Sequence, residues 1–342
     1  MENRKSKGIE AYIGGKNLCL SHFGYTSRLC CILPKVSACS TIAEIFPKAS
    51  HDRLTRMLNG DWSGQTLLDW ALRLLFLVVG GYLIGDDTVI EKPHAKRLNE
   101  AGWVWSSKHN KAVYGVSVVL LVWTDGQLRI PIGFRVWKKG GPSKFELALE
   151  LLSYARNRLK CKPQFVLFDS WYPSKALLKR IGDYGWYFVC RLKKNRGFEG
   201  TSLHKYLRQP YWQATGFLSG KIKVRVVKYR RKYYATNRLS LTAPEVRQLY
   251  KLRQEIEEVI RILKSQLNLE GCQAGYTRST EETTDSQPQP QTHHIALCLV
   301  TYLVVERERF ERGMTWRRFK RRLILKKPHT PLPALERLRM AA

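Results

Sequence analysis

Acidic side chains placed where apolar segments end are the first candidates for chemistry in this sequence. Asp86 and Asp87 end an apolar run that begins at Tyr82, and Asp169 ends the apolar run 164–168. Sites in open α/β sheets gather beyond the carboxyl ends of strands, so we expect these acids to lie together. Clustered carboxylates repel one another unless a cation lies between them, and oxygen ligands favour Mg²⁺ or Mn²⁺. Capping of a following helix is the simpler explanation for each Asp taken alone.

A long helix predicted between residues 242 and 267 adds a fourth acid. The segment Thr242-x-x-Glu245 is a capping box, and an apolar stripe follows it. At about 100° per residue, four polar residues of this helix fall within a stripe about 60° wide, beside the apolar one. These residues, spaced Y-x2-R-x3-E-x6-K, are Tyr250, Arg253, Glu257 and Lys264. The helix can therefore pack on a sheet and point Glu257 at a site, with flanking cations that hold phosphates. A solvated face with ordinary ion pairs is the alternative.

The charge of the chain predicts a polyanionic partner. The 342 residues include 59 Lys or Arg and 28 Asp or Glu, a net charge of +31, which excludes an ordinary metabolic enzyme. The hydrophobic fraction of 44% excludes disorder of the whole chain. Metal-binding carboxylates in so basic a protein point to phosphoryl transfer at a phosphodiester of a nucleic acid.

Residues 191–240 carry the densest positive charge. They contain 14 Lys or Arg and a single acid, Glu199. The alternation from 221 to 226 predicts a strand with one apolar and one basic face. Lys223 and Arg225 on the basic face are candidates for phosphate contact, and Trp212 for stacking on a displaced base. An exposed, solvated sheet face is the alternative for this charge.

Helices are expected in the first 80 residues. Ser50 caps a segment whose outer face carries Arg53 and Arg56, and the pair it forms with a preceding short helix at 41–47 resembles a helix-turn-helix. A plain helical packing domain is equally compatible with this pattern. The longest apolar run, 71–84, contains Arg73 and is shorter than the roughly 20 residues of a membrane span. No secretion-type segment follows the start, so we expect a cytoplasmic protein.

From residue 82 onward, strands and helices alternate. The first elements are a strand and a hairpin that turns at Thr124-Asp125-Gly126. They are followed by a helix capped by Ser143, a strand to 168, a helix at 173–181 and a strand at 186–191. This order predicts an α/β sheet covered by helices.

The combination of motifs resembles a known family. A strand ending in D-x-T, another ending in F-D-S-W-Y, and the Y-x2-R-x3-E-x6-K helix are similar to bacterial insertion-sequence transposases of the DDE type, in the insertion-sequence-four group or a near relative. The resemblance covers about residues 40–310. It implies a ribonuclease-H-like core with a β-rich insertion, preceded by a helical N-terminal region. It also implies that Asp86, Asp169 and Glu257 bind two Mg²⁺ or Mn²⁺ ions and catalyse, with Asp87 as the alternative first acid.

The resemblance further implies a domain plan and an activity. The expected parts are an N-terminal helical DNA-binding region (1–80), a first core segment (81–190), a basic β insertion (191–240), a second core segment with the catalytic Glu (241–312) and a basic tail (313–342). The expected activity is cut-and-paste transposition. A homodimer on DNA would bind the element's terminal repeats, cleave the ends and join the 3′-hydroxyls to double-stranded target DNA in the bacterial nucleoid, without a membrane.

Two other functions remain compatible with the sequence. A metal-dependent nuclease, or a domesticated transposase that cuts without joining, would carry every one of these motifs. A non-catalytic DNA-binding protein would use the acids as helix caps.

Overall fold

The computed structural model divides the chain into two compact units. The first consists of residues 1–77, 89–117 and 260–342, and the second of residues 78–88 and 118–259. The residues that the structure describes are 10–13, 16–19, 50–95, 98–106, 108–206, 208–219, 221–272, 289–325 and 332–341.

Five strands form the centre of the main sheet. They are β3 (Tyr82–Glu91), β5 (Lys111–Thr124), β6 (Arg129–Trp137), β7 (Phe165–Phe168) and β8 (Tyr187–Leu192). Two of them, β3 and β5, contribute residues to both units. Their spatial order is β6-β5-β3-β7-β8, so the first strand lies in the middle, with the hairpin on one side of it. Strand β7 pairs in parallel with both β3 and β8. This arrangement confirms the predicted α/β fold with a ribonuclease-H-like core.

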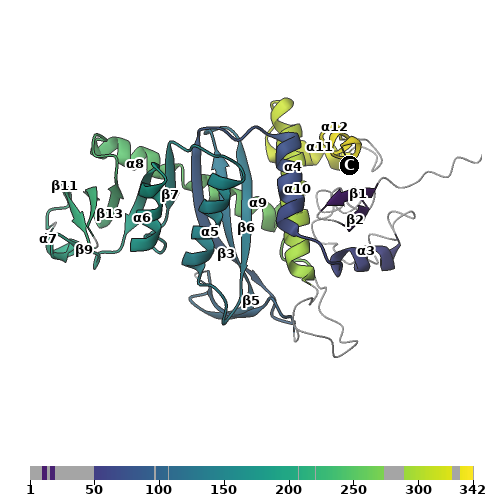
Figure 1. Cartoon of the computed structure of the whole chain (residues 1–342), viewed down its shortest axis with the longest axis horizontal. Coiled ribbons are helices and arrows are strands. Elements are labelled where there is room, and N and C mark those ends of the chain that lie inside the picture. The colour runs from purple at the N-terminus through teal and green to yellow at the C-terminus, as the bar shows by residue number, and fades with distance from the viewer. Residues whose placement is uncertain are drawn as a thin grey trace, which may run out of the picture. The chain divides into compact units, whose positions relative to one another are not determined.

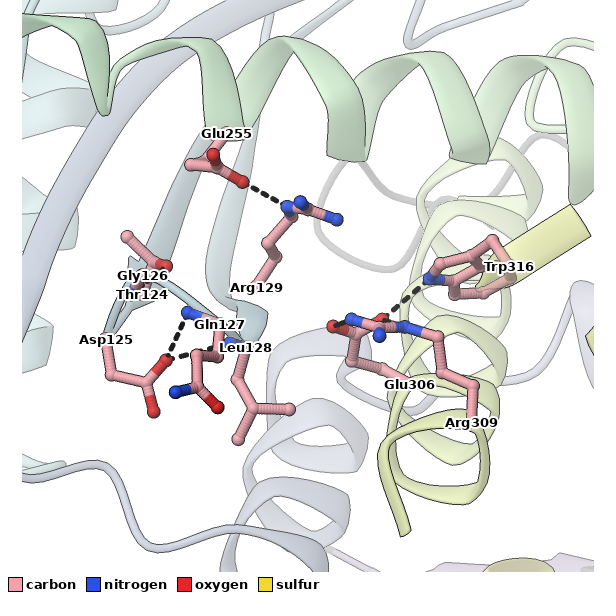
Figure 2. Close-up of polar contacts among 10 residues, drawn as sticks. All are labelled: Thr124, Asp125, Gly126, Gln127, Leu128, Arg129, Glu255, Glu306, Arg309 and Trp316. Carbon is pink, nitrogen blue, oxygen red and sulfur yellow. Dashed lines mark hydrogen bonds and ion pairs between the residues drawn. The ribbon is translucent and has the colours of Figure 1, made fainter. Parts of the chain in front are cut away.

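The β5–β6 turn forms where the sequence predicts it. Asp125 Oδ1 accepts the backbone N–H groups of Gln127 and Leu128, both at 2.8 Å (Figure 2). Gly126 adopts a φ of 98°, in the region that glycine occupies without steric cost. The short side chain of Asp125 thus replaces part of the backbone hydrogen bonding and fixes the hairpin.

Two helices cover this sheet. Helix α5 (Lys144–Asn157) packs on β6, and α6 (Lys175–Asp183) packs on β8 (Figure 1). The predicted capping box at the start of α5 is present, because Ser143 and Glu146 exchange side-chain and backbone hydrogen bonds. Both helices bury leucines on one face, and most of their charged residues face solvent, as in amphipathic surface helices. Lys144 at the start of α5 is the exception, because it pairs with Asp87.

The basic segment after β8 is rich in β-strands, as predicted, and continues the same sheet. Strand β13 pairs antiparallel with β8, and β12 with β13. Within β12 Val224 and Val226 are buried while Lys223 is exposed, which confirms the alternation. The elements of this insertion are β9 (Gly197–Phe198), β10 (Thr201–Ser202), α7 (Leu203–Tyr206), β11 (Tyr211–Leu218), β12 (Ile222–Tyr229) and β13 (Lys232–Thr236).

The single helix predicted from 242 to 267 is wrong in one respect, because it is two helices. Helix α8 (Ala243–Lys251) begins with the predicted capping box and ends before Leu252. At the junction Arg253 N–H bonds to the carbonyl of Tyr250, three residues back, which tightens the last turn. Helix α9 (Gln254–Gln266) then begins. Neither Gly nor Pro lies at this junction, so the sequence carries no signal for the break.

Helix α9 is fixed to the sheet by charge and by apolar contact. Arg129 at the start of β6 forms an ion pair with Glu255 (Figure 2). Ile256 and Val259 are fully buried. Glu257 lies two residues beyond Glu255, about 200° around the helix, and its side chain is 57% exposed. The ion pair thus sets the rotation that leaves Glu257 accessible.

Helices dominate the described part of the first unit. Helix α4 (Gly64–Leu75) lies along α10 (Pro290–Glu311), as Figure 1 shows. Ser50 caps α3 (His51–Leu58) as predicted, and Leu54 and Leu58 of this helix are buried. The remaining elements are β4 (Gly102–Ser106), α11 (Trp316–Leu325) and α12 (Pro333–Met340). The carboxylate of Glu306, fully buried, pairs with Arg309 and accepts a hydrogen bond from Trp316 (Figure 2).

Two short strands correct the expectation of helix at the start of the chain. Strands β1 (Glu10–Ile13) and β2 (Lys16–Cys19) pair antiparallel. The Gly14-Gly15 dipeptide between them in the sequence is a hairpin signal that the helical interpretation overlooked. The short helix predicted at 41–47 lies outside the described residues. Among the residues described, no helix is both long and apolar enough to cross a membrane.

Candidate active site

Asp86 and Asp169 lie side by side on two parallel strands. The prediction that Asp86 and Asp87 end their strand is wrong, because β3 lies beside β5 in the sheet and continues to Glu91, whereas Asp169 does follow the end of β7. The register pairs Gly85 of β3 with Phe168 of β7, so the next residue on each chain is an aspartate. Gly85 is required here, since a Cβ at this position would lie 2.0 Å from the Phe168 ring. The absence of a side chain at Gly85 therefore allows the two strands and the ring to pack directly beneath the acids.

Asp86 and Asp87 have different partners, because successive residues of a strand point to opposite faces. Asp86 Oδ2 accepts a hydrogen bond from Arg253 Nη2 at 3.0 Å. Asp87 pairs with Lys144 Nζ at 2.6 Å and accepts the hydroxyl of Tyr172 at 3.0 Å. The doubled acid of the sequence is thus resolved into one acid on the Arg253 side and one bound to the start of α5.

Arg253 links Asp86 to Glu257. Its Nη2 bonds Asp86 and its Nη1 pairs with Glu257, while its own side chain is only 15% exposed. One guanidinium therefore bridges two carboxylates that come from β3 and α9. Arg253 lies at the junction between α8 and α9, and Glu257 lies in the first turn of α9.

The electrostatic environment opposes the ionised form of Asp86. Burial raises the pKa of Asp86 from 3.8 to about 7; Arg253 acts against this rise, and the charges of Asp169 and Asp87 add to it. Burial also raises the pKa of Tyr172, with Asp87 adding to the effect, so its hydroxyl stays protonated and donates to Asp87. Arg253 therefore offsets only part of the cost of ionising Asp86.

The acids open onto a basic cleft of about 700 Å³. Asp169 and Glu257 line it together with Tyr250, whose ring lies edge-on to Tyr234 at 5.1 Å. Burial raises the pKa of Tyr250, so the phenol is neutral and available as a hydrogen-bond donor. The cations that line the cleft besides Arg253 are Arg191, Arg230, Arg231, Lys232, Arg247 and Lys251.

Lys264 has other partners. Its Nζ donates to the carbonyl of Val89 at 2.6 Å and pairs with Glu270 at 2.9 Å. These contacts bind the end of α9 to the end of β3 within the first unit. The structure thus gives Lys264 a packing role, whereas the sequence grouped it with Tyr250, Arg253 and Glu257.

The candidates chosen in the insertion and in α3 lie elsewhere. Arg225 is half-buried and donates to the carbonyl of Leu241 at 2.7 Å. Lys223 and Trp212 are exposed on β12 and β11 and do not line the cleft. Arg53 and Arg56 are exposed on α3, in the first unit.

Several site residues were missed from the sequence. Lys144 and Tyr172 hold Asp87, and Arg230, Arg247 and Lys251 line the cleft. Tyr172 stands three residues after Asp169 in the F-D-S-W-Y motif, which was a usable signal. The lining cations had no individual signal, because a dense basic segment does not reveal which of its residues face inward.

The carboxylate oxygens of Asp86 and Asp169 are ligands of the type that Mg²⁺ and Mn²⁺ prefer. Burial raises the pKa of Asp86, and a bound cation would offset this cost of ionisation. In this respect the residues fit a divalent cation. Within the described ranges, however, no three His, Cys, Asp or Glu side chains already lie close enough to hold an ion together. Arg253 supplies the positive charge between Asp86 and Glu257.

This fold and its acids define a protein of the ribonuclease-H-like class. Residues 81–282 match the family described as "Transposase DDE domain". Because the match extends over more than half of the chain, the protein belongs to this family. Among the curated proteins none matches the chain.

A solved structure agrees with this assignment at the level of the fold. The chain is similar to a piggyBac transposase, in a structure described as a synaptic complex with hairpin DNA, with a TM-score of 0.50 and 11% sequence identity. The similarity covers 94% of this chain and 73% of that one. At this identity the comparison supports the fold alone.

Proposed function

We propose that this protein is a cut-and-paste DNA transposase of the insertion-sequence-four group or a near relative. It binds the terminal repeats of its own element, cleaves the ends by phosphodiester hydrolysis and joins the 3′-hydroxyls to target DNA. The observation that carries the proposal is that Asp86, within β3, and Asp169, just after β7, lie side by side on parallel strands, with Arg253 joining Asp86 to Glu257.

In this proposal Asp86, Asp169 and Glu257 hold two Mg²⁺ or Mn²⁺ ions. When bound, such ions lower the pKa of an attacking water or hydroxyl and neutralise charge on the leaving oxygen. Asp86 is preferred to Asp87 as the first acid, since Asp87 is already bound by Lys144 and Tyr172. Glu257 is the ligand best placed to exchange partners, because more than half of its side chain is exposed.

The other residues of the cleft would bind DNA. Seven Arg and Lys side chains line it, so the phosphate backbone is attracted without reading of base sequence. Arg253 presents a planar guanidinium whose two Nη groups each bind one carboxylate, and the same two groups can bind a single phosphate in a bidentate manner. Tyr250 can donate its hydroxyl to a phosphate oxygen from the wall of the cleft. Synapsis of two element ends requires two active sites, and therefore a homodimer on DNA.

The test measures cleavage and joining with Glu257→Gln. The substrate is duplex DNA carrying the inverted repeats that flank the gene, incubated with Mg²⁺ and a target plasmid. Loss of a metal ligand removes several kcal/mol of transition-state stabilisation, so cleavage should fall by about 100-fold or more while DNA binding is retained. Glu258→Gln, one residue along α9, is the matched control and should cleave normally.

The outcomes separate the alternatives. A nuclease or domesticated transposase would cut the ends but leave no joined product. A DNA-binding protein without catalysis would show no Mg²⁺-dependent cleavage in the unaltered chain. Equal cleavage by the Glu257→Gln variant and the unaltered protein would refute the assignment of this residue.

A further inference from the structure

An exposed tryptophan stands directly beside the proposed catalytic acids. Trp171 follows Asp169 by two residues, and its side chain is 54% exposed. Its backbone N–H donates to Asp169 Oδ1 at 2.9 Å, so the same turn that places the acid places the indole. A single exposed apolar side chain is ordinary on a protein surface, but this ring stands directly beside a charged site.

The ring is held in a defined orientation. Phe145 of α5 stacks on it with 6.1 Å between ring centroids and an interplanar angle of 17°. Phe145 also meets the fully buried Tyr172 edge-on at 6.2 Å, which anchors the support in the core. A preorganised ring loses little freedom when a ligand stacks on it, so its contribution to binding is not offset by ordering.

An exposed lysine lies over the ring. Lys193, just after β8, places its Nζ 4.3 Å from the centroid of Trp171. The Lys193 side chain is exposed and carries a compact charge on a flexible stem, so it can leave the ring at small cost. A nucleotide can bind both side chains at once. Its base can stack on the Trp171 indole in place of the Lys193 ammonium, and its phosphate can pair with that ammonium.

We propose that Trp171 is a stacking platform for an unpaired base next to the cleaved phosphodiester, with Lys193 moving from the ring to the adjoining phosphate. The inference rests on the proposed function for the presence of DNA. Its location supports it, because Trp171 and Lys193 follow β7 and β8, the strands whose carboxyl ends carry Asp169 and the cleft residue Arg191. A base is favoured over an apolar protein segment because the surroundings are cationic.

The experiment measures binding without catalysis. The full-length chain, in buffer without divalent metal, is titrated against a blunt duplex and against the same duplex ending in a short unpaired thymidine extension, followed by fluorescence anisotropy. We expect the unaltered protein to prefer the extended duplex. Trp171→Ala should abolish that preference, a loss of roughly tenfold at 1–3 kcal/mol per stacked base, while Trp171→Phe should keep most of it.

A matched control lies at the other end of β8. Tyr187 is also exposed, at 42%, and also carries a cation over its ring, with Arg238 at 5.3 Å. Tyr187→Ala should therefore leave the preference for the extended duplex unchanged. Replacement of the unpaired thymidines by 5-iodouracil, followed by irradiation, should crosslink the peptide that contains Trp171.

Three results would overturn the inference: no preference in the unaltered protein, the same preference in Trp171→Ala, or an equal loss of affinity for both duplexes in that variant. The last would indicate a general DNA contact rather than base stacking. Because no cleavage is measured, failure of the Glu257 test leaves this result intact, and failure here leaves the proposed chemistry intact.

Discussion

Two neighbouring isosteric substitutions, Asp86→Asn and Asp87→Asn, should change stability in opposite directions. Each removes one negative charge and keeps the shape of the side chain. Asp87→Asn breaks an ion pair with Lys144 whose side chains are only about one-fifth exposed, 21% and 22%. Loss of such a charged hydrogen bond costs about 2 kcal/mol, while the new amide oxygen can still accept the Tyr172 hydroxyl.

Asp86→Asn, in contrast, should raise the stability of the folded protein at neutral and higher pH. A pKa raised from 3.8 to about 7 means that the folded state holds a proton more tightly than the unfolded state. Stability is therefore lost as the pH rises through that window, by up to about 4 kcal/mol at 1.36 kcal/mol per unit. Asp86→Asn removes this loss. The variant should match the unaltered protein near pH 4 and exceed it in stability above pH 7, in metal-free buffer.

Urea unfolding with EDTA at pH 5 and pH 8, followed by tryptophan fluorescence, gives the free energies, and Mg²⁺ is then added. Mg²⁺ should stabilise the unaltered protein and Asp87→Asn, because both keep Asp86 as a ligand, and should leave Asp86→Asn unchanged. If both variants lose stability equally at pH 8, the assignment of Asp86 to the buried acidic cluster is wrong. If Asp87→Asn loses the response to Mg²⁺, the two acids have been assigned the wrong way round.

Three other predictions concern positions outside the acidic cluster. Gly85→Ala should destabilise the protein by about 1–3 kcal/mol in urea unfolding, since the added methyl would clash with the Phe168 ring. Gly182→Ala, with open space around it, should be neutral or stabilising. Equal effects of the two substitutions would contradict the packing seen at Gly85. Burial lowers the pKa of His294 from 6.5 to about 4, so the free energy of unfolding should fall by up to about 3 kcal/mol as the pH drops from 6.5 to 4. His294→Gln should flatten this pH dependence of stability. An unchanged pH dependence in the variant would exclude His294 as its source. Glu100→Gln should lower the free energy of unfolding by about 1–3 kcal/mol in thermal or urea unfolding. The reason is that the buried Glu100 carboxylate accepts hydrogen bonds from the backbone N–H and the hydroxyl of Thr292, in the first turn of α10. No loss of stability would show that the amide caps the helix equally well.

The fold was largely predictable because it depends on local patterns. The hairpin turn at Asp125, the capping boxes at Ser143 and Thr242, and the alternating strand at 222–226 each combine residue type with a fixed spacing, and each formed as expected. The first strand was predicted too short and β4 was missed. The start of the chain was interpreted as helical although its Gly-Gly dipeptide favours the observed hairpin.

The sequence by itself determined the inventory of the site: which acids follow apolar strands, which segment carries the basic charge, and the motifs that place the chain in its family. Only the tertiary structure decided how these residues meet. Asp86 binds Arg253 whereas Asp87 binds Lys144, and the predicted long helix ends at Leu252 and begins again at Gln254. The partners of Lys264 and the exposure of Trp171 were settled in the same way. The physical reason is that a side chain's direction follows from local backbone geometry, whereas its partners come from strands and helices distant in the chain, whose packing no local spacing encodes.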